Sequence, residues 1–162
     1  MKKIIPVFIC AAFHLSVLPA QHHAQEENGV AQTAIELTHL LAAAWEALDT
    51  EKYMEYFSPE LDFYIEGVRI GYDDLEKMVK QAARTLERTT FEVIDPLVSL
   101  AGRDNALITF RLKETFLGRD GQYEEVNGAM TLHWHYQEEE WKVILAHESF
   151  PNPVPGEKSH GQ

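Results

Sequence analysis

The stretch Gly128–Phe150, GAMTLHWHYQEEEWKVILAHESF, decides the fold of this chain. Large apolar residues alternate with polar ones on both sides of the acidic corner Glu138-Glu139. This pattern predicts two long β-strands, Gln122–Gln137 and Glu140–Phe150, that form a hairpin. The hairpin carries most of the recognisable chemistry of the chain.

The preceding residues extend the same pattern. Thr89–Leu100 and Asn105–Leu117 also alternate with a period of two, and short turns separate all of these segments. Successive short turns predict an antiparallel meander. A further strand is expected at Leu61–Glu66. Alternation alone does not decide whether its inner face carries Asp62, Tyr64 and Glu66 or carries Phe63 and Ile65.

Helices are predicted before these strands. Apolar residues recur at helical spacing over Val30–Asp49 and Leu75–Leu86, and a short helix is expected from Thr50 to about Phe57. Three helices can cover only one face of the sheet. We therefore predict an α+β fold, a cone of three N-terminal helices packed on one curved, mainly antiparallel sheet.

The first twenty residues are predicted to be a secretory signal peptide. Lys2 and Lys3 precede the apolar run Ile4–Leu18, and cleavage is expected after Ala20 or as late as Ala24. The run is too short for the roughly 20 residues of a membrane span. A periplasmic or secreted protein is expected, with an arm at 21–29, the domain at 30–150 and a disordered tail at 151–162.

Composition narrows the function classes. Removal of the signal leaves 12 Lys and Arg against 26 Asp and Glu, a net charge of −14, and removes the only cysteine. So acidic a surface repels nucleic acid and anionic membranes, and neither is expected as a partner. We also expect no cofactor and no metal.

Hairpin register predicts which side chains face the inside of the cone, because directly paired residues share a face. Placing Tyr136 opposite Trp141 gives the further inner pairs Trp134 with Val143, Leu132 with Leu145 and Met130 with His147. Placing Leu117 opposite Gln122 turns Arg111 inward as well. This assignment assumes that no β-bulge interrupts the strands.

The opposite face is expected to bind a second subunit. It would carry His133 and His135 beside three apolar residues that follow one another along the same face of the neighbouring strand: Ile108, Phe110 and Leu112. A patch of that kind on a non-core face predicts a homodimer through the outer face of the sheet.

Several motifs resemble the nuclear transport factor 2-like superfamily, particularly its SnoaL-like branch. They are Ala43-Ala44-Trp45, Phe57–Phe63, Gly71 and Trp141–Ile144 with His147. The hairpin is also similar to the calcium/calmodulin-dependent kinase association domain, in which a pocket arginine falls at Arg111. In the related ketosteroid isomerases the catalytic aspartate falls at Glu66. The resemblance implies an internal pocket and often cofactor-free chemistry.

Glu66 and His147 are the candidate catalytic residues, because a carboxylate and an imidazole in an apolar cone can act as general acid and base. The candidate ligand-binding residues are Trp45, Tyr64, Arg111, Leu132 and Trp134. If Arg111 is inner, it must pair with an internal carboxylate or bind an anionic ligand.

Three functions are consistent with these residues. The favoured one is an exported pocket protein that binds a small, partly apolar ligand. The alternatives are a cofactor-free acid/base enzyme (an isomerase, lyase or hydrolase) and a dimeric association module without a ligand.

Overall fold

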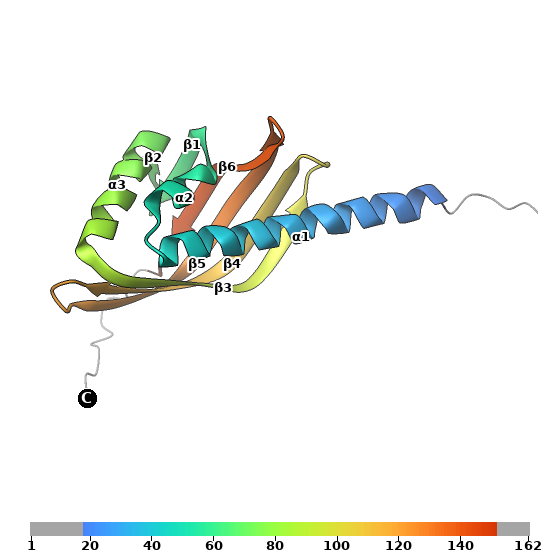
Figure 1. Ribbon diagram of the computed structural model, residues 1–162. Helices are drawn as coiled ribbons and strands as arrows, with labels where there is room; N and C mark the ends of the chain where they lie inside the picture. Colours follow the sequence, from blue (N-terminus) through green and yellow to red (C-terminus); the bar gives the residue numbers. More distant parts are fainter. Residues whose placement is uncertain (1–17, 152–162) are drawn as a thin grey trace, which may run out of the picture.

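A computed structural model describes residues 18–151, which form three helices and one six-stranded sheet (Figure 1). The helices are α1 (Leu18–Glu46), α2 (Thr50–Glu55) and α3 (Tyr72–Thr85). The strands are β1 (Phe57–Ile65), β2 (Val68–Ile70), β3 (Leu86–Leu100), β4 (Asn105–Gly118), β5 (Tyr123–Gln137) and β6 (Glu140–Ser149). The predicted α+β cone is confirmed.

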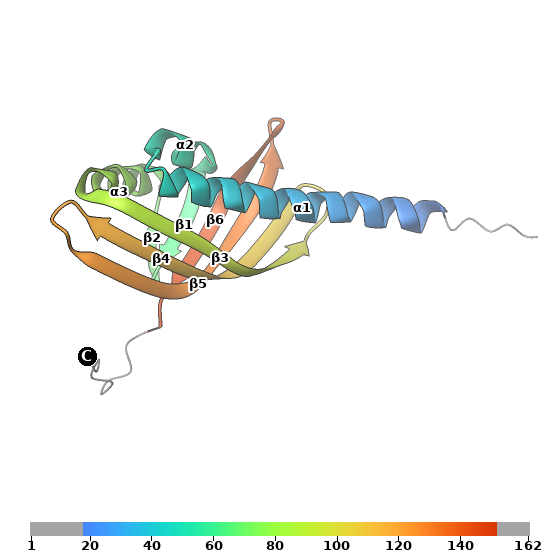
Figure 2. The ribbon, with the colours of Figure 1, turned by 60° about the horizontal axis from the view of Figure 1, so that its bottom comes forward.

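The sheet has the strand order β2-β1-β6-β5-β4-β3. Among these strands β1 and β6 pair in parallel, and the other neighbours pair antiparallel. The sheet curves around α1, which crosses its concave face, while α2 and α3 lie at one end of that face (Figures 1 and 2). The arrangement leaves the other face of the sheet uncovered by helices.

The core lies between α1 and the concave face. Trp134 of β5 is fully buried there, and its indole N–H donates a hydrogen bond to Thr38 Oγ1 of α1 at 3.0 Å. At the edge of the sheet, the backbone N–H of Phe91 donates to the Glu46 carboxylate at 2.8 Å. These two hydrogen bonds attach α1 to the middle and the edge of the sheet.

Several elements differ from the sequence predictions; β1, for example, begins at Phe57 and not at Leu61. Strand β2 was not predicted; it pairs with β1 through the turn Glu66-Gly67, where both residues have positive φ. Helix α1 begins at Leu18, so residues 21–29, which were predicted as an arm, are helical. Residues 1–17 of the predicted signal peptide and residues 152–162 of the predicted tail lie outside the described residues. Within 18–151 no helix is long and apolar enough to span a membrane.

The predicted register of the last hairpin is correct only near its turn. Tyr136 pairs with Trp141 and Trp134 with Val143 as expected, but a bulge follows, and His133 pairs with Leu145. Beyond the bulge Met130 faces Glu148 instead of His147. The extra residue turns His147 outward and Glu148 inward.

The β4–β5 register is also shifted by one residue. Leu117 pairs with Tyr123, not with Gln122, and Arg111 pairs with Ala129. Arg111 therefore lies on the outer face. Of the residues predicted to bind a second subunit, the three apolar ones are buried in the core instead: Ile108, Phe110 and Leu112.

Candidate ligand pocket

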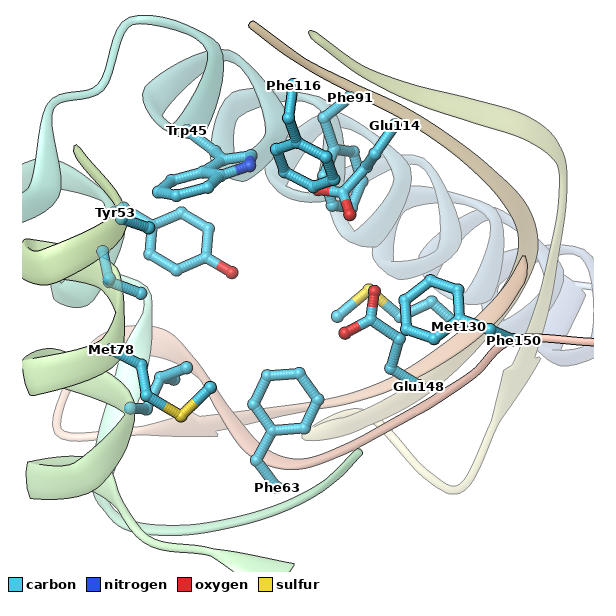
Figure 3. A pocket seen from close by; sticks show the side chains of 13 residues that line it. Trp45, Tyr53, Phe63, Met78, Phe91, Glu114, Phe116, Met130, Glu148 and Phe150 are labelled. Atoms are coloured by element: carbon cyan, nitrogen blue, oxygen red, sulfur yellow. The ribbon is translucent and has the colours of Figure 1, made fainter. Parts of the chain in front are cut away.

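A pocket of about 230 Å³ lies between the helices and the concave face of the sheet (Figure 3). This volume would hold on the order of eight waters at about 30 Å³ each, so the pocket fits a molecule the size of one ring. Its lining residues are Trp45, Tyr53, Phe63, Leu75, Met78, Val79, Ala82, Phe91, Glu114, Phe116, Met130, Glu148 and Phe150.

Helix α3 forms one apolar wall of the pocket. Leu75, Met78, Val79 and Ala82 recur at helical spacing, which places them on one side of the helix. The acidic residues Asp73 and Asp74 occupy the first turn, where the helix dipole favours negative charge. The sequence thus determines both the start of α3 and the face it turns to the pocket.

Aromatic rings from several elements form much of the remaining wall. Trp45 of α1 and Tyr53 of α2 lie with their ring centroids 5.6 Å apart. Phe63 of β1, Phe91 of β3 and Phe150 after β6 line the pocket as well. The close-up shows these rings arranged around the cavity (Figure 3).

Two carboxyl groups interrupt the apolar lining. Glu114 of β4 is 7% exposed and Glu148 of β6 is 9% exposed. On β4, Glu114 continues the series of inward residues Ile108, Phe110 and Leu112, because side chains two apart share a face. Figure 3 shows both carboxyl groups and the Tyr53 hydroxyl directed into the cavity.

The surroundings of both carboxyl groups favour their protonated forms. Burial, followed by the charge of Glu148, raises the pKa of Glu114 to about 8, although a hydrogen bond from the Trp45 side chain opposes the shift. Burial, followed by the charge of Glu66, raises the pKa of Glu148 to about 7. Both groups therefore exchange protons near neutral pH.

The Tyr53 hydroxyl stays protonated. Burial raises the pKa of its phenol, and the charges of Glu148 and Glu114 raise it further. A protonated phenol can donate a hydrogen bond to a ligand oxygen in the cavity. The pocket thus offers one donor and two groups that can donate or accept.

The predicted catalytic residues lie outside this pocket. His147 is exposed on the outer face of the sheet. Glu66 is exposed in the β1–β2 turn, where its carboxylate accepts a hydrogen bond from the backbone N–H of Phe150. The prediction that Glu66 and His147 share one cavity is therefore wrong. Glu66 affects the pocket only indirectly, through its hydrogen bond with Phe150 and through the effect of its charge on Glu148.

The predicted polar ligand contacts are also on the outer face. Arg111 forms an ion pair with Asp95 at 2.5 Å, and its side chain is 69% exposed. Tyr64 lies beside His147 across the β1–β6 pair. Neither Arg111 nor Tyr64 lines the pocket.

The three remaining predicted residues face the interior. Trp45 lines the pocket. Leu132 and Trp134 are fully buried in the core but do not line it. Their side chains fill the space between α1 and the sheet.

The histidine pair of β5 is on the outer face. His133 Nε2 and His135 Nδ1 both lie 3.0 Å from the Asn105 side-chain oxygen. Among the described residues there is no group of three or more His, Cys, Asp or Glu side chains that could hold a metal ion.

Glu114 and Glu148 were missed as site residues. Glu114 could have been found from the sequence, because it is an acidic residue at one of the alternating positions that are otherwise apolar: Ile108, Phe110, Leu112 and Phe116. For Glu148 the alternation pointed to the wrong face, because the bulge ahead of it leaves no clear mark in the sequence.

Comparison with known proteins assigns the class. The family model of the SnoaL-like domain matches residues 35–153, and the chain belongs to this family. The predicted membership is confirmed. No curated protein matches the chain by sequence.

Solved structures of the nuclear transport factor 2-like superfamily share the fold. One, from Salmonella enterica serovar Typhimurium, is 21% identical with a TM-score of 0.70, covering 82% of this chain and 99% of its own. A provisionally assigned scytalone dehydratase from Novosphingobium aromaticivorans is 8% identical, with a TM-score of 0.74 and coverage of 80% and 89%. The association domain of C. elegans CaMKII is 18% identical, with a TM-score of 0.62 and coverage of 80% and 98%. At such identities the likeness shows the fold alone.

Proposed function

We propose that this protein binds a small, mainly apolar molecule in the pocket between α3 and the concave face of the sheet. One observation carries the proposal: a cavity of about 230 Å³ is lined by aromatic and aliphatic side chains, with two carboxyl groups directed into it. Apolar cavities with a few convergent polar groups are the usual form of small-molecule sites.

The test is to recover the ligand. Protein purified from its native host is analysed by native mass spectrometry, and we expect a bound small molecule. The variant Ala82→Phe places a ring in the pocket and should abolish the bound mass. The neighbouring residue Ala83 does not line the pocket, so Ala83→Phe is the control that should retain it. Equal retention by both variants would contradict binding at this site.

A second candidate function is a cofactor-free acid/base enzyme. It is favoured by the pKa values of about 8 and about 7 for Glu114 and Glu148, which lie in the working range of general acids and bases. One ionised carboxylate would take a proton from a carbon of the substrate, the protonated carboxyl would return a proton elsewhere, and the Tyr53 hydroxyl would stabilise the charge that develops on oxygen. The reaction is then an isomerisation or an elimination.

Proton exchange separates this function from simple binding. The recovered ligand is incubated with the protein in deuterated water and followed by NMR. An enzyme of this kind would exchange carbon-bound hydrogen, and Glu114→Gln or Glu148→Gln would slow the exchange by about 100-fold or more. A ligand that keeps its hydrogen while bound would exclude the second candidate.

Export and dimerisation remain part of the proposal. The charge and hydropathy pattern of residues 1–20 supports a signal peptide, and N-terminal sequencing of the mature protein would locate the cleavage. The outer sheet face still exposes Leu97, Leu107 and Leu145, which supports a homodimer through that face even though the residues first expected there are in the core.

A further inference from the structure

The charge of the pocket has one sign. Of the residues that line it, Glu114 and Glu148 are acidic, and none is Lys, Arg or His. Within the described part of the chain, the ion pairs between side chains involve neither carboxyl group. When these carboxyl groups ionise, no cationic side chain in the lining compensates the charge.

The rings around the carboxyl groups have a matching property. Six aromatic residues line the cavity: Trp45, Tyr53, Phe63, Phe91, Phe116 and Phe150. The faces of such rings carry negative electrostatic potential, and groups of them bind alkylated ammonium ions. The aromatic rings and the carboxylates thus both favour a positively charged ligand.

We propose that the ligand of this pocket is a small organic cation, an ammonium group carried on an apolar body no larger than about one ring. The inference rests on the proposed binding function and names the ligand class. An ammonium group supplies the positive charge that the lining lacks, and its alkyl groups contact the aromatic walls. An anionic ligand would face two carboxyl groups without a cation to offset them.

Proton release on binding follows from this assignment. The titratable or hydrogen-bonding groups that face the cavity are Glu114 from β4, Glu148 from β6, Tyr53 from α2 and Trp45 from α1, with Glu66 acting on Glu148 from the β1–β2 turn. The linings from α3, β1, β3 and β5 are apolar. A bound cation stabilises the ionised carboxylates, so their protons leave and affinity rises with pH between about 6 and 8.

Three probes of nearly identical shape test the sign of the charge. They are choline, the neutral 3,3-dimethylbutan-1-ol and the anionic 3,3-dimethylbutanoate, each titrated into the whole mature protein by calorimetry. We expect choline to bind at least tenfold more tightly than the alcohol, and the carboxylate to bind weakest. In buffers of different ionisation enthalpy the choline titration should show proton release.

Isosteric variants locate the effect. Glu114→Gln and Glu148→Gln should each weaken choline binding at least tenfold and leave the affinity for the alcohol unchanged. Glu92 is exposed on β3 and does not line the pocket, so Glu92→Gln makes the same substitution outside the pocket as a control and should change neither affinity. Circular dichroism verifies that each variant is folded.

The outcomes separate the inference from the function beneath it. If the alcohol or the carboxylate binds as tightly as choline, the cation assignment is overturned and small-molecule binding stands. If none of the three binds, the cation assignment is also overturned, and the recovery of a native ligand decides separately whether the pocket binds another molecule. Retention of choline affinity in both Gln variants would overturn the role of the carboxyl groups.

Discussion

At the scale of single residues, the pocket depends on two carboxyl groups placed where the fold disfavours charge. A buried carboxylate loses its hydration, and each tenfold decrease in its acid dissociation constant corresponds to about 1.4 kcal/mol between its two forms. Glu114 and Glu148 bear this cost without a basic partner in the lining. Residues that lower stability in this way are typical of functional sites, because packing alone would favour an apolar side chain.

A decrease of stability with rising pH is the first prediction. The pKa values of Glu114 and Glu148 are raised to about 8 and about 7, so between pH 4.5 and 8 the folded protein binds more protons than the unfolded chain. The two protonated carboxyl groups contribute fully to the free energy of unfolding below pH 4.5, and this contribution is lost as pH rises through 8. The double variant Glu114→Gln/Glu148→Gln cannot ionise at these sites, and it should exceed the wild type in unfolding free energy by a few kcal/mol at about pH 9 but not at about pH 4.5. Urea unfolding across this range measures the difference, and parallel curves would contradict it.

The second prediction concerns a hydrogen bond in the core. Thr38 is fully buried; its hydroxyl accepts from the Trp134 indole and donates to the carbonyl of Ala34 at 2.8 Å. Thr38→Val keeps the shape but leaves the indole N–H unpaired, and it should lower the unfolding free energy by about 1–3 kcal/mol. The Thr33 hydroxyl also donates a hydrogen bond to the carbonyl four residues earlier, that of Gly29, at an exposed site of α1. Thr33→Val should therefore change the unfolding free energy by less than about 0.5 kcal/mol. Equal losses in the two variants would show that the indole bond is unimportant.

At the scale of elements, the sequence predicts which segments form strands better than it predicts their register. Alternation locates β3 to β6 because the apolar and polar residues of each strand alternate with a period of two over about ten residues or more. However, an extra residue at the β6 bulge and another in the β4–β5 turn each reverse which face of the sheet the neighbouring side chains occupy. Neither extra residue changes the hydrophobic pattern enough to be detected in the sequence. For this reason the fold was predicted correctly, while Arg111 and His147 were assigned inward and Glu148 was missed.

The end of β6 provides the third prediction. A Cβ at Gly128 would lie 2.5 Å from the Ser149 carbonyl oxygen and 2.9 Å from Cδ1 of Phe150. The backbone must move to admit it, and overpacking of about 1–3 kcal/mol exceeds the roughly 0.5–1 kcal/mol gained by replacing a flexible glycine. Gly128→Ala should therefore lower the midpoint of urea unfolding and displace Phe150 from the pocket.

An open glycine in a helix gives the contrast. At Gly29 of α1, the position that an alanine methyl group would occupy has no neighbouring atom within 4 Å. Gly29→Ala should therefore be neutral or stabilising by up to about 1 kcal/mol. If Gly128→Ala were equally stabilising, the close approach of Ser149 would not limit that position.

At the scale of the whole molecule, the helices cover one face of the sheet and leave the other to solvent (Figure 2). Two rows of paired residues cross the outer face: Leu97, Thr109, Thr131 and His147 in one, and Ser99, Leu107, His133 and Leu145 in the other. Leu97 is 73% exposed, Leu107 41% and Leu145 37%. Exposed apolar side chains clustered on one face of a sheet are typical of a protein interface.

The last prediction is therefore a dimer formed through this face. Light scattering at micromolar concentration should give twice the monomer mass. Leu107→Glu combined with Leu145→Glu should yield a monomer, because two buried charges without partners cost several kcal/mol at an interface. Leu40 is 53% exposed on α1, away from the sheet face, so Leu40→Glu is the control that should leave the dimer intact. Since the pocket lies on the concave side, the monomeric variant should also keep its ligand; a wild type of monomer mass, or loss of ligand with the dimer, would contradict this separation of assembly from binding.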